Sequence, residues 1–185
     1  VVIIGGVAGG ATAAARLRRL DETAEIVVFE RSGYISYANC GLPYYIGGVI
    51  EDPKALTLQT PENFFSRFRV NVKVRHEVTG IHPESKTVSV KNLETSEEFQ
   101  ESYDKLILSP GAKPTQPRLP GTGIDRLFTL RTVEDTLRIK EYIRKHRPKS
   151  AVLAGGGFIG LELAENLREL GMEVTIVQRP KQLMN

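Results

Sequence analysis

The chain has 185 residues, of which 41% are hydrophobic and 25% are charged, and its formal net charge is +3. This composition is typical of a globular protein and excludes the disordered and fibrous classes, and no apolar run reaches the roughly 18 residues that cross a bilayer. The small charge gives no support for a nucleic-acid or membrane partner. A single cysteine, Cys40, excludes an internal disulfide and indicates a reducing compartment such as the cytoplasm.

The chain begins at Val1, within a strand-like run and without an initiator methionine. At roughly 150 residues per domain, its length corresponds to one domain and part of another. We therefore expect a piece of a longer protein, with one domain over residues 1–113 and the start of a second domain over residues 114–185.

The first 30 residues have the pattern of a strand, a glycine-rich turn, a helix and a second strand. The apolar run over residues 1–4 precedes the turn Gly5–Gly10, and apolar residues at helical spacing follow. Residues 26–29 form a fully apolar, β-branched run that ends at Glu30. Such runs are typical of parallel strands that are covered on both faces.

The middle of the chain is a series of short elements. The pattern predicts a helix over 61–68, half-buried strands over 70–74 and 87–90, a hairpin loop over 92–102, a buried strand over 105–108, a proline-rich linker over 112–123 and an amphipathic helix over 132–146.

The opening pattern then returns. Residues 151–154 form the strand, Gly155–Gly160 the turn, residues 159–170 the helix and residues 174–177 the second strand, which ends at Gln178. Two such openings predict the α/β class, with two Rossmann-like, doubly wound parallel sheets of which the second is incomplete in this chain.

The second turn, Gly155-x-Gly157-x-x-Gly160, is a complete dinucleotide-binding fingerprint. Its glycines permit the tight turn, the approach of the pyrophosphate and close packing of helix on strand. In the first turn Val7 replaces the middle glycine, although Gly6 and Gly9 keep the loop small. Because both turns lie between a strand and a helix, nucleotide binding is favoured over the alternative that the glycines are only structural.

The residue that ends the second strand normally binds a ribose through its carboxylate. Glu30 has this position in the first repeat, which predicts a dinucleotide without a 2′-phosphate, as in FAD. In the second repeat Gln178 and Arg179 follow the strand, and a neutral amide beside a guanidinium tolerates a 2′-phosphate. The second site is therefore predicted to bind NADPH, NADH or both, unless Arg179 is only a solvated surface residue.

Cys40 lies in the distinctive stretch Ser36–Gly48, shortly after the first turn. Helix N-termini favour the ionised form of a thiol, and Pro43 is favourable in the first turn of a helix. We predict that Cys40 lies at a helix N-terminus and faces a flavin. The alternative is that Cys40 is a small, buried hydrophobic residue.

The three histidines have no metal-ligand spacing, so no metal is predicted.

These features resemble the flavin-dependent pyridine nucleotide–disulfide oxidoreductases over the whole chain. The run from Ser36 to Tyr45, with Asn39-Cys40-Gly41 at its centre, resembles their single-cysteine branch of coenzyme A-disulfide reductases, NADH-dependent persulfide reductases and NADH oxidases. The resemblance implies an FAD-dependent NAD(P)H oxidoreductase that reduces a small-molecule disulfide or persulfide of the coenzyme A type. It also implies a homodimer in the full-length protein.

The resemblance implies roles for individual residues. Cys40 is the redox-active residue. The residues implied to bind FAD or the nicotinamide nucleotide are Gly5, Gly6, Val7, Ala8, Gly9, Gly10, Glu30, Arg31, Asn39, Val78, Ser109, Pro110, Gly111, Arg131, Gly155, Gly157, Phe158, Ile159, Gly160, Gln178 and Arg179. The residues implied to bind coenzyme A are Thr12, Arg16, Arg19, Ser36 and Asn39.

The implied reaction passes hydride from NAD(P)H to FAD and electrons on to Cys40, whose thiolate attacks a disulfide or a sulfane sulfur. One alternative is a water-forming NADH oxidase that acts through a Cys40 sulfenic acid. Family peroxidases and many oxidases have a histidine in the first glycine loop, and its absence from Gly6–Gly9 counts against that alternative. A further alternative is a ferredoxin-type reductase or a non-catalytic nucleotide-binding module in which Cys40 is inert.

Overall fold

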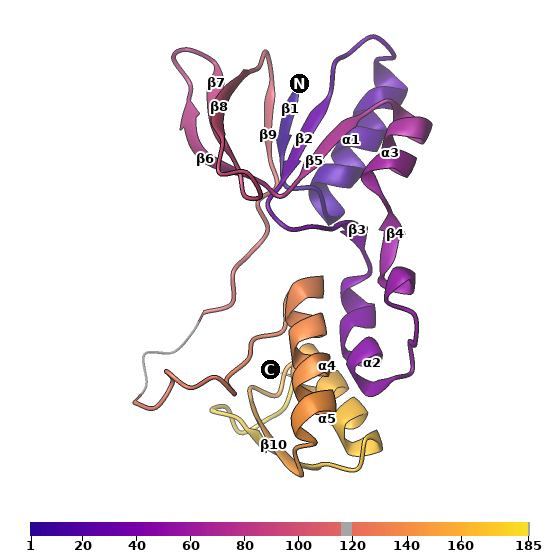
Figure 1. Ribbon diagram of the computed structural model, residues 1–185, viewed down its shortest axis with the longest axis vertical. Helices are drawn as coiled ribbons and strands as arrows, with labels where there is room; N and C mark the ends of the chain where they lie inside the picture. Colours follow the sequence, from indigo (N-terminus) through magenta and orange to yellow (C-terminus); the bar gives the residue numbers. More distant parts are fainter. Residues whose placement is uncertain (116–119, 185) are drawn as a thin grey trace. The chain divides into compact units, whose positions relative to one another are not determined.

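The two N-terminal apolar runs form the centre of a parallel sheet (Figure 1). In the computed structural model, which describes residues 1–115 and 120–184, strand β1 (Val2–Ile4) pairs with β2 (Val27–Glu30) on one side and with β9 (Leu106–Leu108) on the other. Strand β5 (Asn71–Val74) pairs with β2, which gives the order β5-β2-β1-β9. Helix α1 (Ala8–Leu20) connects β1 to β2, as the strand–turn–helix pattern predicts.

Six further elements complete this part of the molecule. They are β3 (Ile35–Tyr37) and β4 (Thr57–Gln59), which pair with each other, helix α3 (Pro61–Phe68), and an antiparallel sheet of β6 (His76–His82), β7 (Thr87–Asn92) and β8 (Glu98–Ser102).

Alternate residues of β1 and β2 enter two different cores. Ile3 and Val28 pack with residues of α1 and α3, whereas Val2 and Phe29 pack with residues of the β6–β7–β8 sheet. Figure 1 shows the corresponding layers, with helices α1 and α3 on one face of the parallel sheet and the antiparallel strands on the other. Burial on both faces explains why these strands are apolar at successive positions, up to Glu30 at the end of β2, rather than at alternate ones.

The prediction of a hairpin loop over residues 92–102 is wrong in part. Residues Glu98–Ser102 form β8, which pairs antiparallel with β7. Its exposure alternates along the strand, and Phe99 packs against the core formed with Val2 and Phe29. The polar residues that indicated a loop are the solvent-facing half of this strand.

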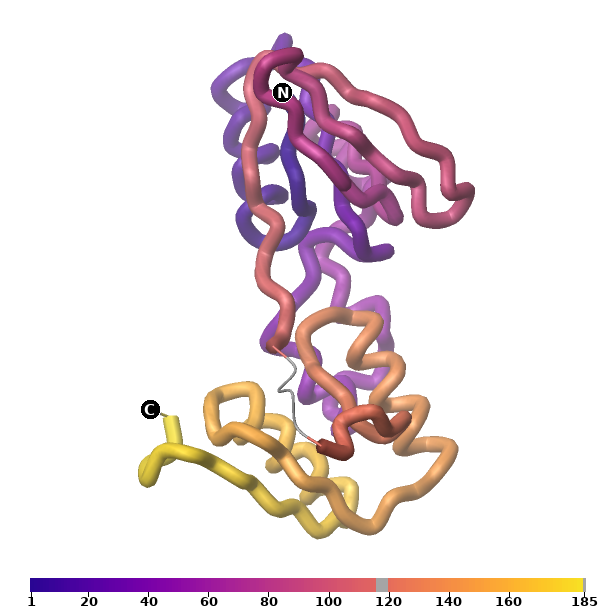
Figure 2. The backbone as a smooth tube through the Cα atoms, turned by 90° about the vertical axis from the view of Figure 1, so that its left-hand side faces the viewer, coloured from indigo at the N-terminus to yellow at the C-terminus, as the bar shows by residue number. Residues whose placement is uncertain are grey.

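The C-terminal repeat forms two parallel strands, β10 (Ser150–Ala154) and β11 (Glu173–Val177), with helix α5 (Phe158–Glu169) between them in sequence. Helix α4 (Val133–His146) precedes them. Helix α2 (Leu42–Gly47), flanked by the 3-10 helices η1 (Asn39–Gly41) and η2 (Pro53–Leu56), lies beside α4 and α5 (Figures 1 and 2).

The chain packs as two compact units. The first contains Val1–Tyr37 and Thr57–Ala112, and the second contains Ala38–Leu56 and Lys113–Asn185. Ile46 of α2 belongs to the buried cluster of the second unit, with Ile139, Leu163, Leu167 and Met172. The predicted domain limits of 1–113 and 114–185 stay a prediction, and residues 116–119 of the predicted linker lie outside the described residues.

No helix in the described part of the chain combines the length and the apolar character that crossing a membrane requires.

Candidate functional site

The first glycine turn, in the first unit, is closely packed on its own backbone. Gly5 has a φ of +94°, and a Cβ at this position would overlap the carbonyl oxygen of Ser109. A Cβ on Gly10 would overlap the carbonyl oxygen of Gly5. Helix α1 therefore approaches the end of β1 more closely than any residue with a side chain permits. This geometry leaves the amide groups at the start of α1 accessible for a phosphate.

The Glu30 carboxylate lies against this turn and is almost buried, with 9% of the residue exposed. Its Oε2 accepts a hydrogen bond from the Gly6 N–H at 2.7 Å, and its Oε1 accepts one from the Ser32 N–H at 2.8 Å. A carboxylate can accept about four hydrogen bonds, so each oxygen retains capacity for a ligand hydroxyl. The position and chemistry of Glu30 fit the recognition of a ribose at this turn.

The second turn, in the second unit, repeats the geometry of the first. The Gly155 N–H donates to the Val177 carbonyl at 2.9 Å, as the Gly5 N–H donates to the Phe29 carbonyl at 2.8 Å. Gly155 has a φ of +110°, and a Cβ on Gly160 would overlap the Gly155 carbonyl oxygen. The sequence repeat is therefore also a repeat of backbone hydrogen bonding.

Gln178 lies where Glu30 lies in the first turn. Its Oε1 accepts a hydrogen bond from the Gly156 N–H at 2.5 Å, and its Nε2 donates to the Gln182 carbonyl at 2.5 Å. The amide therefore supports the loop without the negative charge that Glu30 supplies in the first turn. Arg179, the next residue, is exposed.

The space beside the second turn fits a pyrophosphate. A Cβ on Gly157, the residue before helix α5, would meet no heavy atom within 4 Å. The amides at the N-terminus of α5 and the helix dipole favour an anion in this open space. Each of the two turns thus places amides at a helix N-terminus where a dinucleotide pyrophosphate fits, and the open space at a middle glycine is found in the second turn.

Cys40 is exposed and lies in η1, directly before α2. Its exposure is inconsistent with the alternative of a buried hydrophobe. Cys40 lines a cavity of about 230 Å³ that lies within the second unit. The other lining residues are Asn39, Leu42, Pro43, Leu130, Arg131, Ile159 and Glu162.

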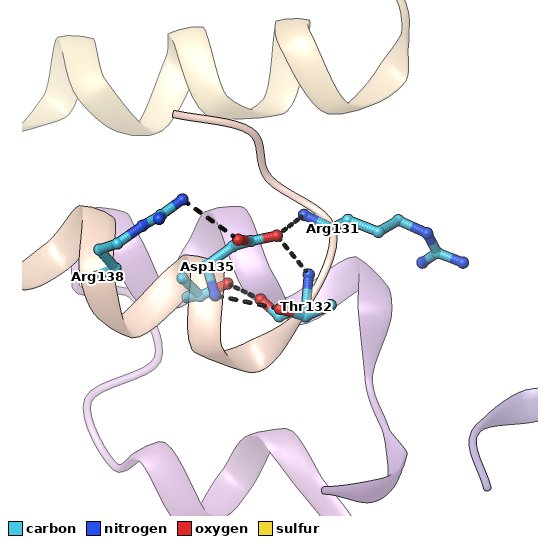
Figure 3. A network of polar contacts seen from close by, with 5 residues as sticks. Arg131, Thr132, Asp135 and Arg138 are labelled. Carbon is cyan, nitrogen blue, oxygen red and sulfur yellow. Dashed lines mark hydrogen bonds and ion pairs between the residues drawn. The ribbon is translucent and has the colours of Figure 1, made fainter. Parts of the chain in front are cut away.

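A polar network at the start of α4 holds the backbone of Arg131 (Figure 3). The Asp135 Oδ2 accepts the N–H groups of Arg131 at 3.0 Å and Thr132 at 3.2 Å, and the Thr132 Oγ1 accepts the Asp135 N–H at 3.2 Å. This capping box fixes the first turn of the helix. The Arg131 side chain extends away from the network and donates from Nη1 to the Asn39 Oδ1 at 3.0 Å.

The far end of α2 is tied to both neighbouring helices. The Lys140 Nζ of α4 donates to the Tyr45 carbonyl at 2.5 Å and lies 3.7 Å from the centre of the Tyr45 ring. Burial lowers the pKa of Lys140, against the opposing effect of the Glu51 carboxylate. Gly47 packs on the buried side chain of Asn166 in α5, where a Cβ would overlap the amide. These contacts make the Cys40 segment part of the second unit.

The residues implied to bind coenzyme A lie in both units, and all of them are exposed or half-buried. Thr12, Arg16 and Arg19 lie on the exposed part of α1, at the spacing that places residues on one side of a helix. Ser36 is half-buried in β3 and has a φ of +46°. These four residues belong to the first unit, whereas Asn39 and Cys40 belong to the second.

Other predicted cofactor residues differ in accessibility. Val78 is half-buried, and its side chain packs against the core that contains Val2 and Phe29. Arg31 is exposed and pairs with Glu77 at 3.4 Å, and Phe158 is 69% exposed. Ser109 packs against the first turn, while Pro110 and Gly111 are exposed.

Four residues that line the Cys40 cavity are absent from the predicted site residues: Leu42, Pro43, Leu130 and Glu162. Helical spacing could have indicated Glu162, because it lies three residues after Ile159 on the same face of α5.

The residues described in the structure contain no group of three His, Cys, Asp or Glu side chains that could hold a metal ion.

Comparison with known proteins places these features in context. A family model described as pyridine nucleotide-disulphide oxidoreductase matches residues 1–185. A coenzyme A disulfide reductase from Staphylococcus aureus (strain MRSA252) is 46% identical over 179 residues, which are 97% of this chain and 40% of that protein. The chain therefore spans about two fifths of the length of the curated relatives it matches.

Solved structures have the same fold. The reduced CoADR-RHD of Bacillus anthracis superposes with a TM-score of 0.97 at 55% identity, over 99% of this chain and 33% of that one. A NAD-dependent persulfide reductase from A. fulgidus superposes with a TM-score of 0.92 at 36% identity, over 98% of this chain and 34% of that one.

Proposed function

The chain belongs to the pyridine nucleotide-disulphide oxidoreductase family, and from this premise we propose that it forms part of an FAD-dependent NAD(P)H oxidoreductase that reduces a disulfide or persulfide of the coenzyme A type. The main structural support is the exposed Cys40 thiol, which lines one cavity with residues of α5, the helix that begins at the second glycine turn. The similarity to a coenzyme A disulfide reductase and a persulfide reductase supports the same substrate class.

We assign the two glycine turns to different nucleotides. Gly5–Gly10 and Glu30 hold the adenosine diphosphate part of FAD, and Gly155–Gly160 with Gln178 holds the nicotinamide nucleotide. The chemistry that FAD supplies when bound is the transfer of two electrons from NAD(P)H. In this proposal the chain's own residues would hold each pyrophosphate at a helix N-terminus and each ribose at a strand end.

Cys40 forms the covalent link to the substrate in this proposal. Its thiolate attacks one sulfur of the disulfide, so that a new S–S bond forms between Cys40 and one half while the other half leaves as a thiolate. Two electrons from NAD(P)H then cleave the mixed disulfide, which releases the second thiol and restores the Cys40 thiolate. Arg16 and Arg19 on the exposed part of α1 are assigned to the phosphates of the substrate.

The proposal also includes a homodimer in the full-length protein and a cytoplasmic location. The homodimer is supported by the family resemblance, and the cytoplasmic location by the lone, unpaired cysteine, which suits a reducing compartment.

A water-forming NADH oxidase is the second candidate. The exposure of Cys40 favours it, because an accessible thiolate can be oxidised to a sulfenic acid. The first glycine loop contains Val7 and Ala8 and no histidine, which counts against it.

A substrate panel with the full-length protein tests the proposal. NADPH and NADH consumption are followed with coenzyme A disulfide, with a persulfide and with oxygen as the acceptor. We expect flavin-dependent consumption with coenzyme A disulfide or the persulfide to exceed the rate with oxygen alone. Equal rates with and without the sulfur acceptors would favour the oxidase, and a protein that retains no flavin would contradict both candidates.

The neutral amide of Gln178 leads to a prediction about nucleotide choice. The Gln178→Glu variant should lower the kcat/KM for NADPH relative to NADH by about tenfold or more, because a carboxylate beside a 2′-phosphate is a close like-charge contact. Arg179 remains in both proteins, so the change isolates the strand-end side chain. Steady-state kinetics with the two nucleotides measure the ratio.

The conservative variant Gln178→Asn shortens the amide without adding charge and is the matched control. It should change the two kcat/KM values in parallel. A wild-type full-length protein that uses NADH and rejects NADPH would show that Gln178 and Arg179 do not set the preference as proposed.

A further inference from the structure

The Cys40 cavity contains a side-chain amide whose orientation is set by a neighbouring arginine. We propose that Arg131 orients the Asn39 amide so that its NH₂ group is the donor available to an anionic sulfur in the cavity, either the Cys40 thiolate or the thiolate that leaves the substrate. This inference rests on the proposed function of Cys40 as the redox thiol. Arg131 is then a positioning residue that acts through Asn39.

The hydrogen-bonding chemistry of the pair permits one orientation of the amide. The Arg131 Nη1 lies 3.0 Å from the Asn39 Oδ1. A guanidinium only donates, whereas an asparagine side chain has one accepting oxygen and one donating nitrogen. The oxygen must therefore face Arg131, and Nδ2 is the group left for a ligand. Asn39, Cys40 and Arg131 all line the same cavity.

The N-terminal capping of α4 holds the backbone of Arg131 in place. The Asp135 carboxylate accepts the backbone N–H of Arg131 at 3.0 Å, within the capping box of α4. Figure 3 shows the Arg131 side chain leaving this network on the side away from Arg138, whose Nη2 lies 3.5 Å from the Asp135 Oδ1. Asp135 thus contacts the backbone of Arg131 and the side chain of Arg138, and of these two arginines it is Arg131 whose side chain bonds Asn39.

A fixed N–H donor beside Cys40 favours thiolate chemistry. Thiol–disulfide exchange has a thiolate as the nucleophile and another as the leaving group, and a hydrogen bond to an anion is stronger than one between neutral groups. With the amide reversed, its oxygen would be the group presented to the cavity, and it would repel the same anions. Glu162 also lines the cavity, so Arg131 and Glu162 bring groups of opposite charge to it.

The test measures how the alkylation rate of Cys40 depends on pH. Iodoacetamide reacts with the thiolate, and mass spectrometry of the Cys40 peptide reports that site in the full-length protein. Asn39→Leu, which keeps the side-chain volume without a donor, should slow alkylation at pH 7 by about tenfold or more and move the midpoint of the profile to higher pH, as expected for loss of one hydrogen bond to a charged group.

Variants of the arginine test the positioning role. Arg131→Met should give a smaller change in the same direction, about threefold, because the amide remains but can reverse. Arg131→Lys restores a donor-only partner and should lie close to the wild type. Combined with Asn39→Leu, Arg131→Met should add little, since both act through one amide. Arg138→Met removes the other arginine at Asp135 and is the matched control with an unchanged profile.

Three results would overturn the inference. One is an unchanged profile in both Asn39→Leu and Arg131→Met. Another is an equal shift in Arg138→Met, which would indicate a general loss of the α4 N-terminus. The third is that Arg131→Lys fails to restore the pH dependence of Cys40 alkylation that Arg131→Met loses. If Asn39→Leu does not fold, the comparison of these two Arg131 variants tests the inference. Absence of disulfide turnover in the wild type would reject the proposed function and leave the alkylation comparison readable.

Discussion

Replacing Cys40 by serine is expected to abolish disulfide reduction by the full-length protein while flavin content and flavin reduction by NAD(P)H remain at the wild-type level. The loss in turnover should be roughly 10³-fold or more, the scale seen when a nucleophile is removed. A serine hydroxyl scarcely ionises near pH 7, whereas a cysteine supplies the thiolate that attacks sulfur. Both half-reactions are measured on the same preparation, by stopped-flow absorbance and by steady-state turnover.

The exposed residue Val49, which lies with Cys40 in the stretch Ala38–Leu56, provides the control. Val49 is 71% exposed and lines no part of the Cys40 cavity, so Val49→Ser should keep both half-reactions. Full turnover by Cys40→Ser would exclude the single-cysteine mechanism. Loss of flavin from Cys40→Ser, with Val49→Ser intact, would instead identify Cys40 as a packing residue.

Removing the Glu30 carboxylate is expected to weaken flavin binding by about tenfold to a hundredfold, the range for one lost charge-assisted hydrogen bond. In Glu30→Ala the ribose loses its partner, and the N–H groups of Gly6 and Ser32 lose the acceptor that holds the loop. The loss of loop order adds to the loss of the ligand contact. Flavin retained after dialysis, measured by absorbance against protein concentration, reports the effect.

Two further variants separate charge from shape. Glu30→Gln keeps one acceptor oxygen and should retain more flavin than Glu30→Ala. Glu77→Ala removes a surface carboxylate that pairs with Arg31 at 3.4 Å, and it should leave flavin content unchanged. If Glu30→Ala retains the wild-type amount of flavin, the assignment of Glu30 to the adenosine ribose is wrong.

The regular elements with strong apolar patterns could be predicted from the sequence. The two strand–turn–helix openings and the helix over 132–146 are confirmed, because their signals are local: runs of β-branched residues, glycine turns and helical spacing. The sheet β6–β7–β8 was harder to predict. One of its faces is exposed, so β8 reads as a polar loop and β6 has too few buried residues to stand out.

The short strands β3 and β4 were also missed. Each has three residues, too few for a period of two to be visible, and they are separated by the whole segment 38–56. Their pairing is a tertiary property rather than a local one.

The residues of the candidate site divide in the same way. Cys40, Glu30 and the glycines could be predicted because each has a recognisable place in a local motif. The glycines lie between a strand and a helix, Glu30 ends the second strand, and Cys40 follows the first turn. The contact between Arg131 and Asn39 joins residues 92 positions apart. No local pattern indicates such a pair, and the same applies to Lys140 with Tyr45 and to Asn166 with Gly47. These contacts depend on how α2 packs, which only the folded chain determines.

The path of the backbone between the two units limits how this protein can be dissected. The chain leaves the first unit after Tyr37, contributes residues 38–56 to the second, returns at Thr57 and leaves again after Ala112. One proteolytic cut in the stretch after Ala112 therefore does not release the second unit, since α2 still joins it to the first. A polypeptide that begins at Lys113 lacks Ile46 from its core and lacks Cys40 itself. Exchange of the C-terminal unit between related proteins would thus have to transfer two separate stretches of sequence, or the incoming helices α4 and α5 would pack against a foreign α2.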